Sequence, residues 1–103
     1  MSKETVAIVF GGRSSEHEIS CLSAGGVLSA IDRNKYEALL IGITKDGNWV
    51  LVPETHQLSI IDGKLPEVPS SAPHVVADVA GFSVGGKPLK VDVIFLIFLF
   101  FKC

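Results

Sequence analysis

Residues 6–20 read VAIVFGGRSSEHEIS, and the fold class can be inferred outward from this stretch. Residues 6–10 are all apolar, which is typical of a strand buried on both faces, as in a parallel sheet. Gly11 and Gly12 then interrupt the apolar run. The stretch therefore predicts a buried strand that ends in a glycine loop.

A helix is expected directly after this loop. Ser15 is followed three residues later by Glu18, a capping-box spacing that predicts a helix beginning near Glu16. Apolar residues then recur at helical spacing, at Ala24, Val27, Leu28 and Ile31. Gly25 and Gly26 weaken this helix, and we attribute them to close packing of the helix on the sheet.

A second apolar run at residues 38–43 predicts another core strand. Strand, helix and strand at this spacing form a βαβ unit, in which the two strands are parallel. Asp46 and Gly47 then predict a hairpin turn that leads into a strand at residues 49–51.

The second half of the chain is less regular. Residues 53–72 are rich in Pro and Ser and predict an irregular surface segment, and residues 84–87 predict a turn. Residues 91–95 predict a third core strand, which residues 96–101 extend without any polar side chain. A strand of this composition is prone to aggregation, so we expect residues 91–101 to promote self-association.

Composition limits the class of protein. A chain of 103 residues corresponds to one small domain, and its net charge of −2 offers no basic surplus for binding nucleic acid. Its two cysteines, Cys21 and Cys103, are expected to be reduced thiols, with Cys21 in the core, and no zinc site is expected. No apolar stretch reaches the ~20 residues of a membrane span, so we expect a cytoplasmic protein without a membrane segment.

The candidate site is the loop between the first strand and the helix. Ligands of open α/β sheets bind at the carboxyl ends of the strands, where glycines let the backbone approach closely and a helix N-terminus offers free N–H groups. The loop lacks the third glycine of a dinucleotide fingerprint. It would place a carboxylate and an imidazole over a small-molecule crevice. The alternative is that Glu16 and Glu18 only favour the helix N-terminus and that His17 is a solvated surface residue.

Residues 6–20 resemble the opening motif of bacterial D-alanine–D-alanine ligases. The resemblance continues at Ser23-Ala24 and at residues 34–36, 42–49 and 91–95, and it covers residues 3–95. It implies an α/β, Rossmann-like (pre-ATP-grasp) three-layer domain with a mainly parallel sheet. The family joins two D-alanines with ATP for peptidoglycan biosynthesis: one carboxylate is phosphorylated, and the amine of the second D-alanine attacks the acyl phosphate.

The resemblance also implies the site residues. Glu16 matches the motif glutamate that pairs with the ammonium group of the first D-alanine, a role that suits a carboxylate in a partly dehydrated crevice. We therefore expect Glu16 to be the catalytic and substrate-binding residue. Ser15, His17 and Ser20 match further motif positions and are weaker candidates for substrate contact, with capping, solvation and helix packing as their alternative roles.

The sequence departs from the family after Phe95. A His-Gly segment and a Gly-Glu-Asp-Gly loop are expected there, and residues 96–103 read LIFLFFKC instead. We therefore divide the chain into a substrate-binding domain at 1–95, incomplete at its C-terminus, and a divergent hydrophobic tail at 96–103, as in a truncated or frameshifted reading frame. By resemblance the complete enzyme uses ATP and Mg²⁺ and is a homodimer, whereas this fragment is expected to bind neither cofactor and to be inactive alone.

Two other functions stay open at this point. The chain could be a non-catalytic Rossmann-like module that binds a small ligand or a partner, or an inactive truncation product. The second substrate of the ligase, D-alanine, D-lactate or D-serine, is not readable from these residues.

Overall fold

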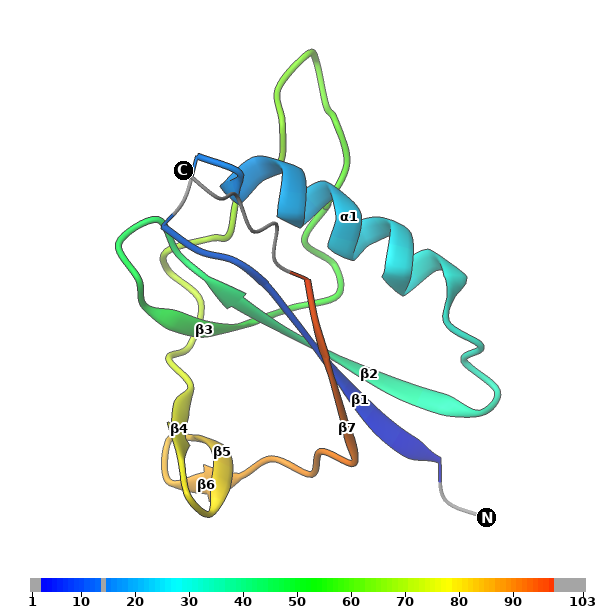
Figure 1. Cartoon of the computed structure of the whole chain (residues 1–103), viewed down its shortest axis with the longest axis vertical. Coiled ribbons are helices and arrows are strands. Elements are labelled where there is room, and N and C mark those ends of the chain that lie inside the picture. Colours follow the sequence, from blue (N-terminus) through cyan, green and yellow to red (C-terminus); the bar gives the residue numbers. More distant parts are fainter. Residues whose placement is uncertain (1–2, 14, 98–103) are drawn as a thin grey trace, which may run out of the picture.

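The computed structural model describes residues 3–13 and 15–97. Its main sheet has four strands in the order β3-β2-β1-β7 (Figure 1). Three of them are parallel, namely β1 (Glu4–Gly11), β2 (Tyr36–Ile43) and β7 (Val93–Leu96), and β3 (Trp49–Val52) runs antiparallel to β2. The expected α/β fold with a mainly parallel sheet is confirmed.

The helix α1 (His17–Ala30) connects β1 to β2 and lies across one face of the sheet (Figure 1). Its apolar stripe packs on this face as expected, with Ala24 fully buried and Val27 and Leu28 partly buried. The sheet contributes alternate residues of its strands to the same core, which are Val6, Ile8, Phe10, Ala38, Leu40, Val50 and Val52. Strand β1 lies between two parallel neighbours, so its residues 7–10 are completely buried.

The opposite face of the main sheet is covered by a second, antiparallel sheet. It consists of β4 (Val76–Asp78), β5 (Gly81–Val84) and β6 (Lys87–Pro88). The rings of Trp49 and Phe82 stack across the interface with their centroids 6.2 Å apart. Helix, main sheet and small sheet are thus three layers, as the family resemblance implied, and the third layer is built of strands.

The predicted turns are also present. Gly47 has a φ of 94° in the loop between β2 and β3, and Gly85 and Gly86 have positive φ in the turn between β5 and β6. Residues 53–72 contain no named strand or helix. Positive φ carries little penalty for glycine, which is why these positions could be recognised in the sequence.

Two explanations of local sequence features were wrong. Glu16 is the N-cap of α1 and makes no side-chain cap hydrogen bond, so Ser15 and Glu18 do not form a capping box. Glu18 instead pairs with Lys45, whose Nζ lies 2.8 Å from its carboxylate. Gly25 packs closely, but not on the sheet: a Cβ there would lie 2.4 Å from the carbonyl oxygen of Leu58, whereas one at Gly26 would meet nothing within 4 Å.

The third parallel strand is not a core strand. Instead, among the described residues β7 pairs only with β1, and its residues Val93, Ile94, Phe95 and Leu96 are 44–59% exposed. Ile97 directly after it is buried, and its N–H donates to the carbonyl of Val9 over 2.8 Å. The boundary placed between residues 95 and 96 stays a prediction, and residues 98–103 of the proposed tail lie outside the described part of the chain.

We predict that the 103-residue chain self-associates through β7, because an apolar edge strand offers unpaired backbone groups and side chains to a second chain. Leu96→Lys should increase the monomer fraction, since a charge on an edge strand opposes strand addition. Val79→Lys adds the same charge at a fully exposed residue of the small sheet's turn and should leave association unchanged.

Light scattering at micromolar concentration measures both variants. A wild-type chain that is a clean monomer, or equal effects of the two lysines, would contradict the prediction.

Candidate functional site

The candidate site lies at the carboxyl end of β1. Strand β2 lies on one side of β1 and β7 on the other, so the strand order reverses here. In open α/β sheets, ligands bind in the crevice outside the carboxyl ends of the strands at such a reversal. The loop that leaves β1 and enters α1 lies at this edge of the sheet.

Glu16 lies at the end of this loop, immediately before α1. It is half-buried, and its carbonyl accepts the N–H of Ser20 over 2.9 Å in the first turn of the helix. A carboxylate at a helix N-terminus is favoured by the helix dipole. Ser15 is exposed beside it. The structure therefore places the main predicted residue at the expected edge of the sheet.

Gly11 allows β1 to turn away from β2 at this edge. Its φ is 91°, and a Cβ at this position would lie 2.4 Å from the carbonyl oxygen of Ile43. The next N–H, of Gly12, donates to that same carbonyl over 2.7 Å. Both the conformation and the close approach require glycine at position 11.

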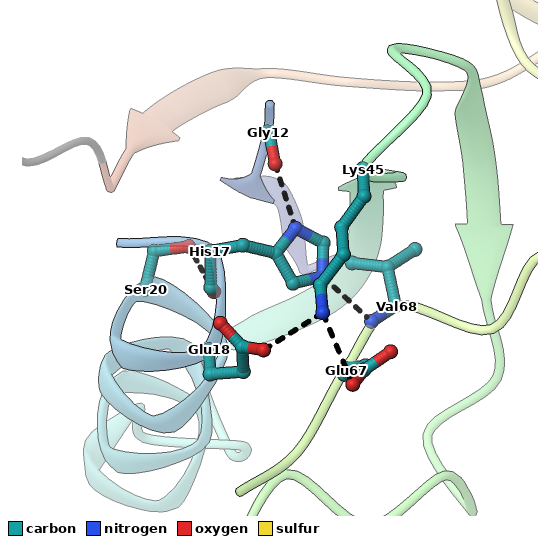
Figure 2. Close-up of polar contacts among 7 residues, drawn as sticks. All are labelled: Gly12, His17, Glu18, Ser20, Lys45, Glu67 and Val68. Carbon is teal, nitrogen blue, oxygen red and sulfur yellow. Dashed lines mark hydrogen bonds and ion pairs between the residues drawn. The ribbon is translucent and has the colours of Figure 1, made fainter. Parts of the chain in front are cut away.

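His17 is not a solvated residue, as the alternative interpretation had it. Its side chain is 1% exposed, and both ring nitrogens have partners (Figure 2). Nδ1 lies 2.7 Å from the carbonyl oxygen of Gly12, and Nε2 lies 3.2 Å from the backbone nitrogen of Val68. His17 therefore joins the site loop to a segment that is 51 residues further along the chain.

Ser20 is equally buried and also bonds within the protein. Its Oγ accepts the N–H of Gly11 over 2.7 Å and lies 2.9 Å from the carbonyl oxygen of His17. Contact of His17 or Ser20 with a substrate stays a prediction. Cys21 next to them is fully buried, as expected, and burial raises the pKa of its thiol to about 12, which makes it a packing residue and not a nucleophile.

Lys45 forms a second connection between the start of α1 and the segment around residue 67, beside that of His17. Lys45 Nζ lies 2.8 Å from the carboxylate of Glu18 and 3.2 Å from that of Glu67 (Figure 2). The hydrogen bond from Lys45 lowers the pKa of Glu18, and the two carboxylates raise the pKa of Lys45. Lys45 and Glu67 are exposed and Glu18 is half-buried, so solvent screens the ion pairs and they contribute little to stability, but they keep residue 67 near the helix.

The packing of Val68 also holds the segment around residue 67 in place. Its side chain packs where the sheet has no side chains: a Cβ at Gly42 would lie 2.7 Å from Val68 Cγ1, and a Cβ at Gly11 would lie 2.9 Å from Val68 Cγ2. Val68 is buried in the core that lies under α1. Residues 66–68, which we call the strap, thus lie across the carboxyl ends of β1 and β2.

Surface hollows of about 340–410 Å³ lie elsewhere on the described part of the chain. Two of them are lined chiefly by residues of the segment 54–67, a third is lined by residues of β1, β2 and the segment 88–90, and Glu16 lines none of these three. Within residues 3–13 and 15–97, no three His, Cys, Asp or Glu side chains gather so as to hold a metal ion. The one helix of these residues is too short to cross a membrane.

The geometry defines a class of protein: an open α/β domain with a mainly parallel sheet, whose strand-to-helix loop lies at the carboxyl end of β1. The family model described as "D-ala D-ala ligase N-terminus" matches residues 5–98. The chain belongs to this family.

Complete relatives support this membership. A D-alanine–D-alanine ligase of Kineococcus radiotolerans is 49% identical over 90 residues, which are 87% of this chain and 21% of that protein. One of Mycolicibacterium smegmatis is 59% identical over 66 residues, which are 61% of this chain and 17% of that protein. The chain thus spans about a fifth of the length of the curated relatives that it matches.

Solved structures agree on the fold. VanG, a D-Ala:D-Ser ligase from Enterococcus faecalis, superposes with a TM-score of 0.72 and 31% identity, covering 92% of this chain and 29% of VanG. The D-alanine–D-alanine ligase of Coxiella burnetii superposes with a TM-score of 0.70, covering 89% of this chain and 28% of that enzyme, and at 24% identity it supports the fold alone.

Sequence reasoning missed the strap. Glu67 and Val68 lie in a segment that was expected only to be irregular, and Lys45 was noted only as part of the stretch 42–49 that resembles the family. No local pattern marks residues whose partners lie more than twenty positions away. The one available signal was Gly42, a glycine inside an apolar strand, which indicates close approach by another segment.

We predict that Gly42→Ala destabilises the chain by about 1–3 kcal/mol, because the added methyl group overlaps Val68. Val68→Ala in the same chain should recover part of this loss, since it empties the overlapping volume. Gly26→Ala is the matched control, and it should be neutral or stabilising by up to about 1 kcal/mol, because the position is helical and open.

Chemical denaturation of the single and double variants gives the coupling free energy. Additive effects of Gly42→Ala and Val68→Ala would show that the two residues do not share this space.

Proposed function

We propose that this chain is the part of a D-alanine–D-alanine ligase that holds the first D-alanine, with Glu16 as the partner of the substrate's ammonium group. The position of Glu16 carries the proposal: a half-buried carboxylate at the N-cap of α1, beside the reversal of strand order. A carboxylate there can form a charge-assisted hydrogen bond to an ammonium group and so orient the amino acid.

The names of the relatives support D-alanine as the first substrate. The curated relatives are D-alanine–D-alanine ligases, and the VanG neighbour, at 31% identity, is a D-Ala:D-Ser ligase. The two classes differ in the second substrate and share D-alanine. A site on this N-terminal segment that both classes have in common would therefore hold the shared substrate.

The remaining steps belong to the rest of the complete ligase in this proposal. There, ATP phosphorylates the carboxylate of the first D-alanine, and the amine of the second displaces phosphate to form the peptide bond. ATP and Mg²⁺ are bound by that remainder of the complete ligase in this proposal, and this chain contributes the site of the first D-alanine. The dipeptide product serves peptidoglycan and cell-wall synthesis, and we place the complete enzyme in the cytoplasm as a homodimer.

In a complete ligase that carries this segment, Glu16→Gln should reduce kcat/KM for the first D-alanine. Loss of a charge-assisted contact reduces binding by about ten- to a hundred-fold. Glu37→Gln removes the same charge from an exposed position on β2 and serves as the control with unchanged kinetics. Steady-state kinetics with varied D-alanine measure both, and wild-type values for Glu16→Gln would refute its role.

The 103-residue chain alone should form no D-alanyl-D-alanine. It spans about a fifth of the length of complete ligases, and in this proposal the nucleotide is held by the remainder. The measurement is release of phosphate from ATP in the presence of D-alanine and magnesium, with a complete ligase as the positive control. Phosphate release from the pure chain that depends on D-alanine would contradict the assignment of the ATP step.

A further inference from the structure

We infer that His17 is a positioning residue that holds the Glu16 loop in place by bonding it to the strap. The inference rests on the proposed role of Glu16 and adds to it the means by which the carboxylate is fixed. The observation behind this inference is that the buried imidazole of His17 makes two hydrogen bonds.

The first hydrogen bond closes the loop on itself. His17 is the first residue of α1, and Gly12 is the first residue after β1. The 2.7 Å contact between Nδ1 and the carbonyl oxygen of Gly12 therefore joins the two ends of the segment that contains Glu16. A loop closed at both ends has fewer conformations available, so Glu16 is held near one position.

The second hydrogen bond specifies the tautomer of the imidazole. The backbone N–H of Val68 is a donor only, so Nε2 of His17 must accept from it. A carbonyl oxygen is an acceptor only, so Nδ1 must carry the proton that it donates to Gly12. The two contacts thus agree on one neutral form, with hydrogen on Nδ1, and both are satisfied at once.

The strap can act as an anchor because it is itself fixed. Val68 packs over Gly42 and Gly11, and Lys45 joins Glu67 to Glu18. Two neighbouring residues of α1 are in this way connected to two neighbouring residues of the strap, as Figure 2 shows. His17 bonds to Val68, and Glu18 is connected to Glu67 through Lys45. Movement of the loop would require movement of a segment that is packed into the core.

The tautomer can be tested directly in the wild-type chain. Nitrogen-15 NMR at a pH where the imidazoles are neutral should find His17 protonated on Nδ1 and unprotonated on Nε2. His56 provides an internal control with the opposite form, because its Nε2 lies 2.8 Å from the carbonyl oxygen of Glu67 and must donate. Hydrogen on Nε2 of His17 would overturn the inference.

Two conservative substitutions separate the two bonds in a complete ligase that carries this segment. His17→Asn keeps an amide donor near Gly12 and loses the acceptor for Val68, whereas His17→Gln can reach Val68 and loses the donor to Gly12. Each should raise KM for the first D-alanine by about two- to ten-fold, the effect of one lost hydrogen bond, with kcat less affected. Leu28→Ala, which removes packing at the far end of α1, controls for stability and should leave KM unchanged.

A double-mutant cycle distinguishes positioning from a general structural role. If His17 acts through Glu16, His17→Gln should add nothing to KM once Glu16→Gln is present. Equal effects of His17→Gln in both backgrounds would overturn the inference while leaving the proposed function intact. Wild-type KM for Glu16→Gln itself would instead refute the proposed function.

Discussion

The absence of side chains at Gly11 and Gly42 is the constraint on which the site depends. These two positions leave a shallow space at the carboxyl ends of β1 and β2, and Val68 fills it. Its packing brings the backbone N–H of Val68 to the buried imidazole of His17, and the imidazole in turn bonds the carbonyl of Gly12. A methyl group at either glycine would displace the strap and, through His17, the loop that carries Glu16.

Three kinds of interaction surround this space, namely apolar packing, ion pairs and buried hydrogen bonds, and they contribute differently to the structure. Packing of Val68 removes apolar surface from water and does not depend on salt. The pairs of Lys45 with Glu18 and Glu67 lie at the surface, where salt screens them. The buried hydrogen bonds of His17 contribute direction, because each satisfies a polar group that would otherwise be buried without a partner. Core packing therefore fixes the strap, and the two hydrogen bonds of the His17 imidazole hold the site loop against it.

The sequence predicted those parts of the fold that depend on neighbours along the chain. The buried run 6–10, the helix stripe from Ala24 and the turn at Gly47 each follow from spacing within a few residues. Glu16 was located because a recognisable motif follows a recognisable strand. The role of His17 was not predictable, since its burial depends on Val68, and Glu18 could not be seen to prefer Lys45 over the cap. Interactions between distant segments decided the contacts of His17 and Glu18 that were missed, whereas the exposure of β7 follows from its place at the edge of the sheet.

The reversal of strand order at β1 places the carboxyl end of this strand between β2 and β7. The Glu16 loop lies at this edge and carries polar side chains. Ile97 lies beside β1 as well, because its N–H donates to the carbonyl of Val9. Residues 96–101 are all apolar, where the family has a His-Gly segment. In the proposed function, polar recognition of an amino acid at this edge rests on the loop before α1. The two hydrogen bonds of His17 fix the position of that loop, and this position determines where the Glu16 carboxylate lies.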